Sequence, residues 1–393
     1  MSGALEITAA RTLDEVEALR PAWEALQGTE LTTDLDYFLT VLRHDPRVLR
    51  PHVLLAHRAG EPCWLVAGRL QDTRLRCRLG YRKLYEPPVR TLIVAPGGFL
   101  GTVADADPLP ALDALRRSIG RSEVDAIHLP SVRLGSPLGA ALAHGTRRAG
   151  RSVAAPRAHW TMRVPGTVDD FLGSLSSSTR QGVRRYAKKL EREHADTLAL
   201  DRVTTPDGLD RFFRDAAAVA RTTYQHGLGV GVREDDELQR ALVALGLERG
   251  WFRGYVLSLQ GRPAAFWHGY GYRGIFRTMV PGFDPTYASL NIGTYVLVKL
   301  IEDLCADPAI HTLDFGLGDA EYKRRFGDSS WEEQDVVVFS SSFRAQRIHA
   351  VRSMLLAGVG VGRRVGERGA TGARVKKAWR RRIATAGNAR PTS

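Results

Sequence analysis

A tyrosine and a lysine stand side by side in a polar segment that follows two closely spaced glycines. The segment reads Asp314-Phe-Gly-Leu-Gly-Asp-Ala-Glu-Tyr-Lys-Arg-Arg-Phe-Gly327. Tyr322 supplies a proton donor and Lys323 a cation, and both suit a reaction in which an oxygen or a leaving atom gains negative charge. Asp314 is the third candidate, and we expect it to fix the end of a strand more than to take part in the chemistry. An exposed helix lysine and a packed core tyrosine are the alternatives for Lys323 and Tyr322.

The elements around this pair predict a ligand site. Residues 312–315 have the pattern of a short buried strand, which Gly316 and Gly318 end. Residues 319–325 then predict a helix, with Asp319 available as its cap. In open α/β sheets, ligands bind at the carboxyl ends of strands. We therefore expect a binding site where this strand gives way to the helix.

The upstream sequence predicts a mainly antiparallel sheet followed by a helix. A tight turn at Gln260-Gly261 separates the first two strands. Apolar residues recur at helical spacing between positions 294 and 304. The predicted strands are 254–259, 263–272, 274–279 and 335–339, and the predicted helix is 294–304.

The start of that helix predicts an anion site. Small residues leave its first N–H groups open, and Ser289 or Asn291 can cap it. Helix amino ends favour negative charge. We expect the phosphate groups of a donor to bind there, at Ser289, Asn291, Ile292, Gly293 and Thr294.

Two further groups of residues are candidates for acceptor binding. Arg180 and Arg184 lie in the most basic predicted helix, which Ser176 caps, and could hold a phosphate or carboxylate. A solvated helix face is the alternative. His268 alternates with Phe266 and Tyr270 on one strand face, where a core histidine is as plausible as a general base.

This succession of elements resembles the core of the GNAT acyltransferase fold. The Ser289–Gly293 and Asp314–Gly327 phrases are similar to the branch found in polysaccharide-biosynthesis clusters, which is related to the Fem-type peptidyltransferases. The resemblance runs from Trp160 to Ser341. It implies an acyl-CoA donor, most simply acetyl-CoA, with Lys323 near the scissile acyl group and Tyr322 as acid for the leaving thiol.

The same resemblance implies an acceptor side at Arg180 and Arg184, with which we group His268 and Phe326. One departure concerns the donor. GNAT enzymes that use acetyl-CoA carry an Arg/Gln-x-x-Gly-x-Gly/Ala loop at this helix, where this chain has Tyr287-Ala-Ser-Leu-Asn-Ile-Gly293.

The amino-terminal part repeats the order helix, hairpin, strand, helix, strand, helix. We interpret residues 1–155 as a degenerate GNAT-like domain with a structural or acceptor-binding role, 156–342 as the catalytic domain and 343–393 as a basic amphipathic tail. The fold class is thus mixed α/β, with tandem GNAT-like domains. The predicted elements are helices 13–26, 34–42, 109–119 and 137–148, and strands 52–57, 63–70, 75–79, 91–94 and 126–129.

Composition favours a two-domain chain in a reducing compartment. The chain has 393 residues, of which 44% are hydrophobic. Its three cysteines show neither metal-ligand spacing nor a disulfide framework, and its start lacks an export signal. We expect a cytoplasmic protein that binds no metal and that can associate peripherally with the inner face of the membrane. The sequence also lacks the zinc-protease, serine-hydrolase and P-loop motifs.

The net charge of +13 resides in the tail. Residues 341–393 hold 13 Lys and Arg against the single acid Glu367, a net of +12, which leaves +1 for the rest. Residues 373–384 place Trp379 and Ile383 on one face among cations, a pattern typical of a helix on an anionic membrane. A solvated basic tail is the alternative, and glycines between 358 and 372 predict a flexible linker.

The sequence therefore predicts an acyltransferase that acts on an amine or hydroxyl of a glycan, glycolipid or cell-envelope precursor by direct attack. An aminoacyl-tRNA-dependent transferase of the Fem type is one alternative, in which the tail contacts tRNA. A non-catalytic adaptor that keeps the GNAT shell and docks on a membrane is the other.

Overall fold

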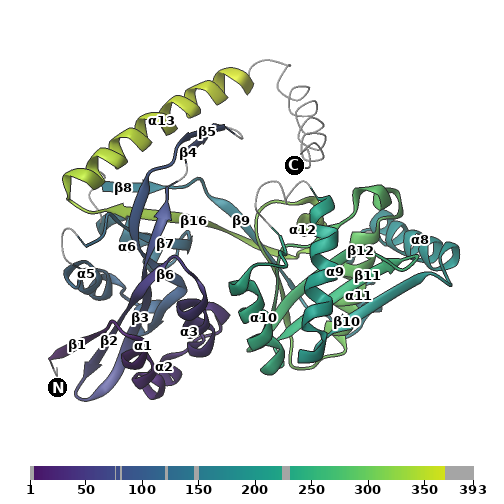
Figure 1. Ribbon diagram of the computed structural model, residues 1–393, viewed down its shortest axis with the longest axis horizontal. Coiled ribbons are helices and arrows are strands. Elements are labelled where there is room, and N and C mark those ends of the chain that lie inside the picture. Colours follow the sequence, from purple (N-terminus) through teal and green to yellow (C-terminus); the bar gives the residue numbers. More distant parts are fainter. Residues whose placement is uncertain are drawn as a thin grey trace, which may run out of the picture. The chain divides into compact units, whose positions relative to one another are not determined.

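The computed structural model describes residues 4–75, 77–79, 82–119, 123–145, 150–223 and 231–367. These residues form two compact units (Figure 1). The first unit comprises the described parts of residues 1–156 and 332–385, and the second comprises those of 157–331.

The first unit is built on a mainly antiparallel sheet in the order β1-β2-β3-β6-β7-β16, with β8 also paired to β16. Only the β6–β7 pair is parallel among its described strand pairs, over Thr91–Ile93 and Ala126–His128. A separate hairpin joins β4 and β5. The strands are β1 (Leu5–Ala10), β2 (Val48–Arg58), β3 (Glu61–Arg74), β4 (Cys77–Leu79), β5 (Arg82–Tyr85), β6 (Pro88–Gly101), β7 (Ala126–Arg133), β8 (Arg151–Val153) and β16 (Ser329–Phe339).

Helices cover both faces of this sheet because each face is apolar. Trp23, Phe38 and Leu65 belong to the core beneath α1 to α3, and Trp64, Leu92 and Leu115 to the core beneath α5 and α6. The helices are α1 (Leu13–Ala18), α2 (Arg20–Leu26), α3 (Leu35–His44), α4 (Thr102–Asp105), α5 (Leu109–Arg117), α6 (Pro137–Gly145) and α13 (Phe343–Glu367), and η1 (Leu31–Thr33) is a 3₁₀ turn.

The first helical segment differs from the sequence prediction. Residues 13–26 were expected to form one helix, and they form two, α1 and α2. Pro21 lies at the start of α2, where a missing N–H costs nothing but a continuous helix would lose a hydrogen bond. Thr12 and Glu15 close a capping box at the start of α1.

The second unit repeats the mainly antiparallel architecture in the order β9-β15-β13-β12-β11-β10, with β14 paired to β12. The β13–β15 pair is parallel. The strands are β9 (Arg157–Arg163), β10 (Leu198–Val203), β11 (Phe252–Leu259), β12 (Arg262–Tyr272), β13 (Ile275–Thr278), β14 (Gly282–Phe283) and β15 (Thr312–Leu317). Each expected strand between residues 254 and 315 is present, which confirms the predicted mixed α/β fold class.

Helix α11 provides the central helix of the core on one face of this sheet. Val296, Leu300 and Leu304 recur at helical spacing and are fully buried against β11, β12 and β15. Helix α9 buries Phe212 and Phe213 on the other face, near Phe252. The helices are α7 (Val168–Ser174), α8 (Ser177–Glu193), α9 (Leu209–Thr222), α10 (Glu237–Glu248), α11 (Ile292–Cys305) and α12 (Glu321–Phe326), with 3₁₀ turns η3 (Pro206–Gly208) and η5 (Pro285–Leu290).

The end of the chain is arranged differently from the domain boundaries that the sequence suggested. Most of β16 pairs with β7 and β8 in the first unit, although the prediction placed it in the catalytic domain. Helix α13 extends past Gly358 and Gly362, within the predicted linker, and its Ala345 and Ile348 are buried in the first unit. The predicted membrane face around Trp379 lies outside the described residues. Among the described helices, none combines the length and apolar character needed to cross a membrane.

This packing predicts that two truncations differ in their effect on the melting temperature. Ending the chain after Ser342 removes Ala345 and Ile348, which are 0% and 4% exposed, and uncovers Phe339. Loss of a buried side chain of that size costs about 2–4 kcal/mol. We expect the melting temperature to fall for that chain and to stay unchanged when the chain ends after Glu367. Equal melting temperatures in a thermal scan would show that α13 adds no stability.

Candidate functional site

The parallel pairing of β13 and β15 ends early, and beyond it the two chain segments stay paired only with their outer neighbours, β12 and β9. The last paired residues are Arg277 and Asp314. Beyond them Gly282 pairs with β12, whereas Gly316 and Leu317 pair with β9. We call this divergence, between residues 279–283 and 315–317, the fork. It lies at the carboxyl end of both strands, where ligands of α/β sheets bind.

Asp314 fixes the base of the fork through polar contacts to three chain segments. Its carboxylate accepts hydrogen bonds from His159 Nε2 at 2.7 Å, Arg277 Nε at 2.8 Å and the Gly316 N–H at 2.6 Å. Its own carbonyl accepts from the Thr278 hydroxyl at 3.1 Å. Burial raises the pKa of Asp314, but His159 and Arg277 outweigh burial and the net pKa is lowered. Asp314 is therefore a buried carboxylate that joins β15 to β9 and β13.

Lys323 is held at the end of β15 by backbone carbonyl groups. Its Nζ donates to Gly316 O at 3.1 Å and to Leu317 O at 2.8 Å, and the residue is only 6% exposed. A lysine ammonium has three donors, so one N–H remains for a ligand. Burial lowers the pKa of Lys323 to about 8, and the charge of Asp314 opposes this shift. Lys323 is thus a cation at pH 7 and is held in one place.

Two glycines make this contact possible. Gly316 and Gly318 have φ of +69° and +106°, values that other residues rarely adopt. The chain can therefore turn sharply after β15 and expose its carbonyl groups to the helix that follows. Asp319 was expected to cap this helix, but it pairs with Arg324 instead, and Ala320 occupies the cap position without a side-chain hydrogen bond.

Tyr322 lies next to Lys323 and packs among aromatic rings. Its ring meets Trp267 and Phe315 edge to face, at centroid distances of 5.3 and 6.0 Å. Burial raises the pKa of Tyr322 to about 12. The hydroxyl therefore stays protonated at neutral pH, where it can donate a proton or a hydrogen bond but is not a general base.

The amino end of α11 has the features expected of an anion site. Asn291 adopts a left-handed conformation with φ of +55°, and its carbonyl accepts from the Thr294 and Tyr295 N–H groups. The N–H groups of Ile292 and Gly293 precede these bonds and have no intrahelical partner by position. No acidic residue lies in this first turn. Ser289, in the 3₁₀ turn η5, does not cap α11, since Asn291 occupies that position.

The predicted acceptor residues on α8 make polar contacts with α7. Arg180 donates to the Gly173 carbonyl at 3.3 Å, and Arg184 pairs with Asp169 at 3.4 Å. Helix α8 itself packs against α11, and both helices line a cavity of about 170 Å³ that includes Asn291 and Thr294. Neither arginine lines this cavity, and among the described residues no hydrogen bond or ion pair joins either of them to Lys323.

Two predicted acceptor residues are buried in the core. His268 is fully enclosed by aromatic side chains, with Phe212 and Phe266 5.4 and 5.9 Å from its ring. Burial lowers its pKa to about 3, so the imidazole is neutral. Phe326 is 3% exposed and packs on Phe171. Strand alternation explains why His268 lies in the core and not at the predicted acceptor site. Its side chain points to the face of β12 opposite the one that carries Trp267, which contacts Tyr322.

No local sequence pattern marks three residues that complete the site. His159 and Arg277 come from β9 and β13, and Trp331 stacks on His159 at a centroid distance of 4.5 Å. Arg277 and His159 lie 37 and 155 residues from Asp314 along the chain. Only the strand order brings them together. No cluster of metal-ligating side chains occurs among the residues that the structure describes.

Comparison with known proteins identifies the architecture. Residues 177–324 match the family described as "Acetyltransferase (GNAT) domain". This segment carries a GNAT domain. The match includes β10 to β15 and most of α12, and thus Asp314, Tyr322 and Lys323. No curated protein matches the chain.

Several solved structures are similar to this chain. FemX has 13% identity and a TM-score of 0.56, with 84% of this chain and 96% of FemX covered. A conserved protein of unknown function from Bacteroides thetaiotaomicron has 12% identity and a TM-score of 0.50, with 85% and 100% covered. A tandem GNAT protein from the clavulanic acid biosynthesis pathway has 13% identity and a TM-score of 0.49, with 86% and 99% covered. At such identities the first two matches indicate a common fold and no more.

Proposed function

We propose that the second unit transfers an acyl group from acyl-CoA to an amine or hydroxyl group at the fork. The observation that supports this most strongly is the position of Lys323. A buried cation is held by Gly316 and Leu317 at the end of β15, where the β13–β15 pairing has ended. An ion that is fixed before substrate binds needs little reorganisation as charge develops.

Each residue at the fork has a distinct role in this proposal. Lys323 offers its remaining N–H to the acyl oxygen and stabilises negative charge during direct attack by the acceptor. Tyr322 donates its proton to the departing thiolate, for which a hydroxyl with a raised pKa is available in protonated form. The acceptor nitrogen or oxygen releases a proton as its bond to the acyl carbon forms, and this proton restores the Tyr322 hydroxyl, through solvent where the two are not in contact. Asp314 keeps β15 in register with β9 and β13 and does not touch the substrate.

The donor is placed by the amino end of α11. The Ile292 and Gly293 N–H groups suit a pyrophosphate because they are oriented along the helix axis and no nearby carboxylate competes in the first turn. Gly293 leaves room there, since a Cβ added to it would only approach Phe283 at 3.5 Å. The carbonyl of Gly293 is fixed by Trp267 Nε1 at 2.9 Å.

For the acceptor we propose a glycan, glycolipid or cell-envelope precursor, in line with the polysaccharide-biosynthesis branch that the sequence resembles. Arg180 and Arg184 are candidates to hold an anionic group of that acceptor. The excess of 12 positive charges after residue 340 supports a contact of the tail with an anionic membrane surface. Aminoacyl-tRNA is the alternative donor, so a binding experiment must compare it with acyl-CoA.

A glycine substitution tests the donor site. Gly293→Glu adds bulk and negative charge at the α11 amino end, so we expect acyl-CoA affinity, measured by calorimetry, to fall below detection. Folding should survive because the added Cβ makes only an ordinary contact. Gly173→Glu is the matched control, since that position on α7 is open and exposed. Undiminished acyl-CoA affinity in Gly293→Glu would exclude this donor site.

A further inference from the structure

The first unit contains a charged cavity that the proposed acyl transfer does not use. Its volume is about 450 Å³, within the range of small-molecule sites. It is bounded by β3, β6, β7 and β16, by the loop before β2, and by α13. The charged and imidazole side chains that line it are Arg47, Arg69, Arg74, His128, Asp335 and Arg352.

Strand register shows that the polar lining belongs to one face of the sheet. Arg69 lies opposite Ile93, Ile93 opposite His128, and His128 opposite Val337. These four residues therefore form a row across four neighbouring strands and share a face. The next row pairs Gln71 with Thr91.

The same face of β3 is apolar closer to its start. Leu65 and Ala67 are fully buried in the core beneath α3. Arg69 follows them at the spacing of two residues that keeps a side chain on one face. Arg69 therefore places a charge on a face that is apolar at Leu65 and Ala67. A charge in that position favours a ligand of opposite charge in the cavity.

The lining carries an excess of positive charge. Arg47 is paired with Asp45 at 2.8 Å, and Asp335 accepts from the Ser131 N–H at 3.0 Å. Four guanidinium groups and these two carboxylates leave two positive charges uncompensated. His128 adds none, because burial lowers its pKa and the imidazole is neutral.

One of the two inner arginines, Arg352, is incompletely satisfied by the protein. Arg352 bonds to the Ser152 hydroxyl, but its buried Nε has no hydrogen-bond partner among the described residues. Arg69 donates to the amide oxygen of Gln71 at 3.2 Å, and burial lowers its pKa. Burying a guanidinium is costly unless an anion accompanies it. A bound anion would remove that cost.

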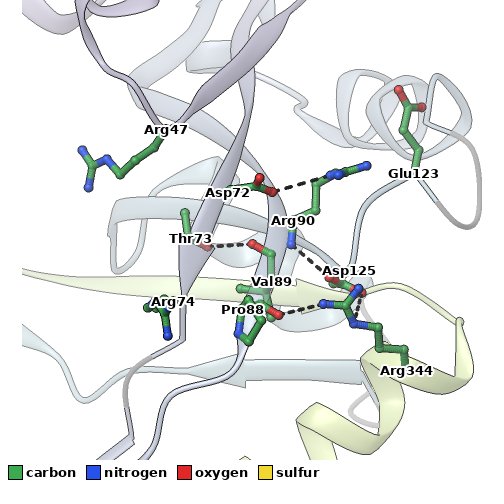
Figure 2. A pocket seen from close by; sticks show the side chains of 10 residues that line it. All are labelled: Arg47, Asp72, Thr73, Arg74, Pro88, Val89, Arg90, Glu123, Asp125 and Arg344. Carbon is green, nitrogen blue, oxygen red and sulfur yellow. Dashed lines mark hydrogen bonds and ion pairs between the residues drawn. The ribbon is translucent and has the colours of Figure 1, made fainter.

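A second cavity of about 650 Å³ adjoins the first and shares Arg47, Thr73 and Arg74 with it. Figure 2 shows these three residues on one side of that cavity and Arg90 and Arg344 on the other. The two arginines that line only the second cavity are matched, since Arg90 pairs with Asp72 at 3.6 Å and Arg344 with Asp125 at 3.7 Å. The charge excess is therefore concentrated at the 450 Å³ cavity.

We propose that the first unit binds a doubly negative phosphoryl compound, a phosphomonoester or a pyrophosphate, in the 450 Å³ cavity between the sheet and α13. Arg69 and Arg352 bind its inner oxygens and Arg74 binds at the rim. Guanidinium groups recognise phosphate through paired hydrogen bonds. A charge of −2 matches the excess on the lining, whereas one carboxylate would leave a cation uncompensated.

The test uses the full chain and inorganic pyrophosphate as the probe. Calorimetry is expected to show binding to the wild type and a rise in its melting temperature. Arg352→Gln should weaken binding about tenfold or more, the loss typical of one hydrogen bond to a charged group. Arg69→Gln should do the same. Arg58→Gln, which removes an exposed arginine at the end of β2, should bind like the wild type.

Melting of the unliganded variants separates binding from folding. Arg352→Gln should melt no lower than wild type, because it removes a half-buried guanidinium whose Nε has no partner among the described residues. Two further probes distinguish the sources of such a group: uridine diphosphate represents a soluble compound, and vesicles containing phosphatidic acid represent a lipid headgroup. The proposal is overturned if millimolar pyrophosphate gives no heat, if Arg58→Gln weakens it as much as Arg352→Gln, or if citrate binds as tightly. None of these readouts depends on acyl transfer.

Discussion

Replacing Lys323 by methionine is expected to reduce turnover by about 10²–10³-fold, the loss typical of one oxyanion donor. Methionine keeps the length and apolar stem of the side chain but removes the charge. The melting temperature should change little, because the two lost bonds to Gly316 and Leu317 are offset by the removal of a buried ammonium group. The measurement is the initial rate of thiol release from acyl-CoA, together with a thermal scan.

The pH dependence of turnover distinguishes two roles for Lys323, a stabilising cation and a general base. With a pKa of about 8, Lys323 is charged at pH 7 and loses its proton as the pH rises through 8. A stabilising cation therefore predicts that wild-type turnover falls above pH 8, whereas a general base predicts that it rises. Arg324→Met, on the exposed side of α12, is the control and should retain normal turnover. If Lys323→Met melts far lower but turns over normally, Lys323 is a structural residue.

Asp314→Asn is expected to lower the free energy of unfolding by about 3 kcal/mol. The substitution keeps the shape but removes the negative charge that His159 and Arg277 contact at 2.7 and 2.8 Å. Breaking a buried pair costs about 3–5 kcal/mol, and the lower end applies because the Arg277 side chain is 27% exposed. Denaturant unfolding at pH 7 measures the difference between variant and wild type.

Acid should abolish this difference. The pKa of Asp314 is lowered on folding, so its stabilisation is complete above the unfolded pKa of about 4 and is lost as the pH falls through the folded pKa. Asp319→Asn is the control, since that carboxylate is 54% exposed and forms a surface pair with Arg324 worth less than about 1 kcal/mol. A cost for Asp314→Asn that stays constant down to pH 2 would assign the effect to packing.

Local periodicity was sufficient to predict most elements of both units. The strand expected at 263–272 is β12, and the helix expected at 294–304 is α11. These predictions succeeded because alternation and helical spacing are properties of neighbouring residues. The one helix that divided into α1 and α2 did so at Pro21, a residue that marks helix starts.

The site was less predictable because strand pairing is not local. Lys323 and Asp314 could be found from the glycine-punctuated segment, but His159 and Arg277 join Asp314 only through the order β9-β15-β13. The pairing of β16 with β7 and β8 joins residues about 200 positions apart, such as Val337 and His128. For His268 the error was the opposite one, because a core residue was assigned to the site. A histidine in a strand does not show whether its face of the sheet forms a site or an aromatic core.

Amide hydrogen exchange with and without acyl-CoA tests the central claim most directly, because it locates the donor without knowledge of the acceptor. The proposed function predicts slower exchange in residues 279–283, 291–295 and 315–318 when acetyl-CoA or a longer acyl-CoA is added. The protection should disappear in Gly293→Glu and persist in Gly173→Glu. Charged tRNA serves as the parallel ligand. Unchanged exchange at the fork with every acyl-CoA, together with protection by charged tRNA, would contradict an acyl-CoA-dependent transferase.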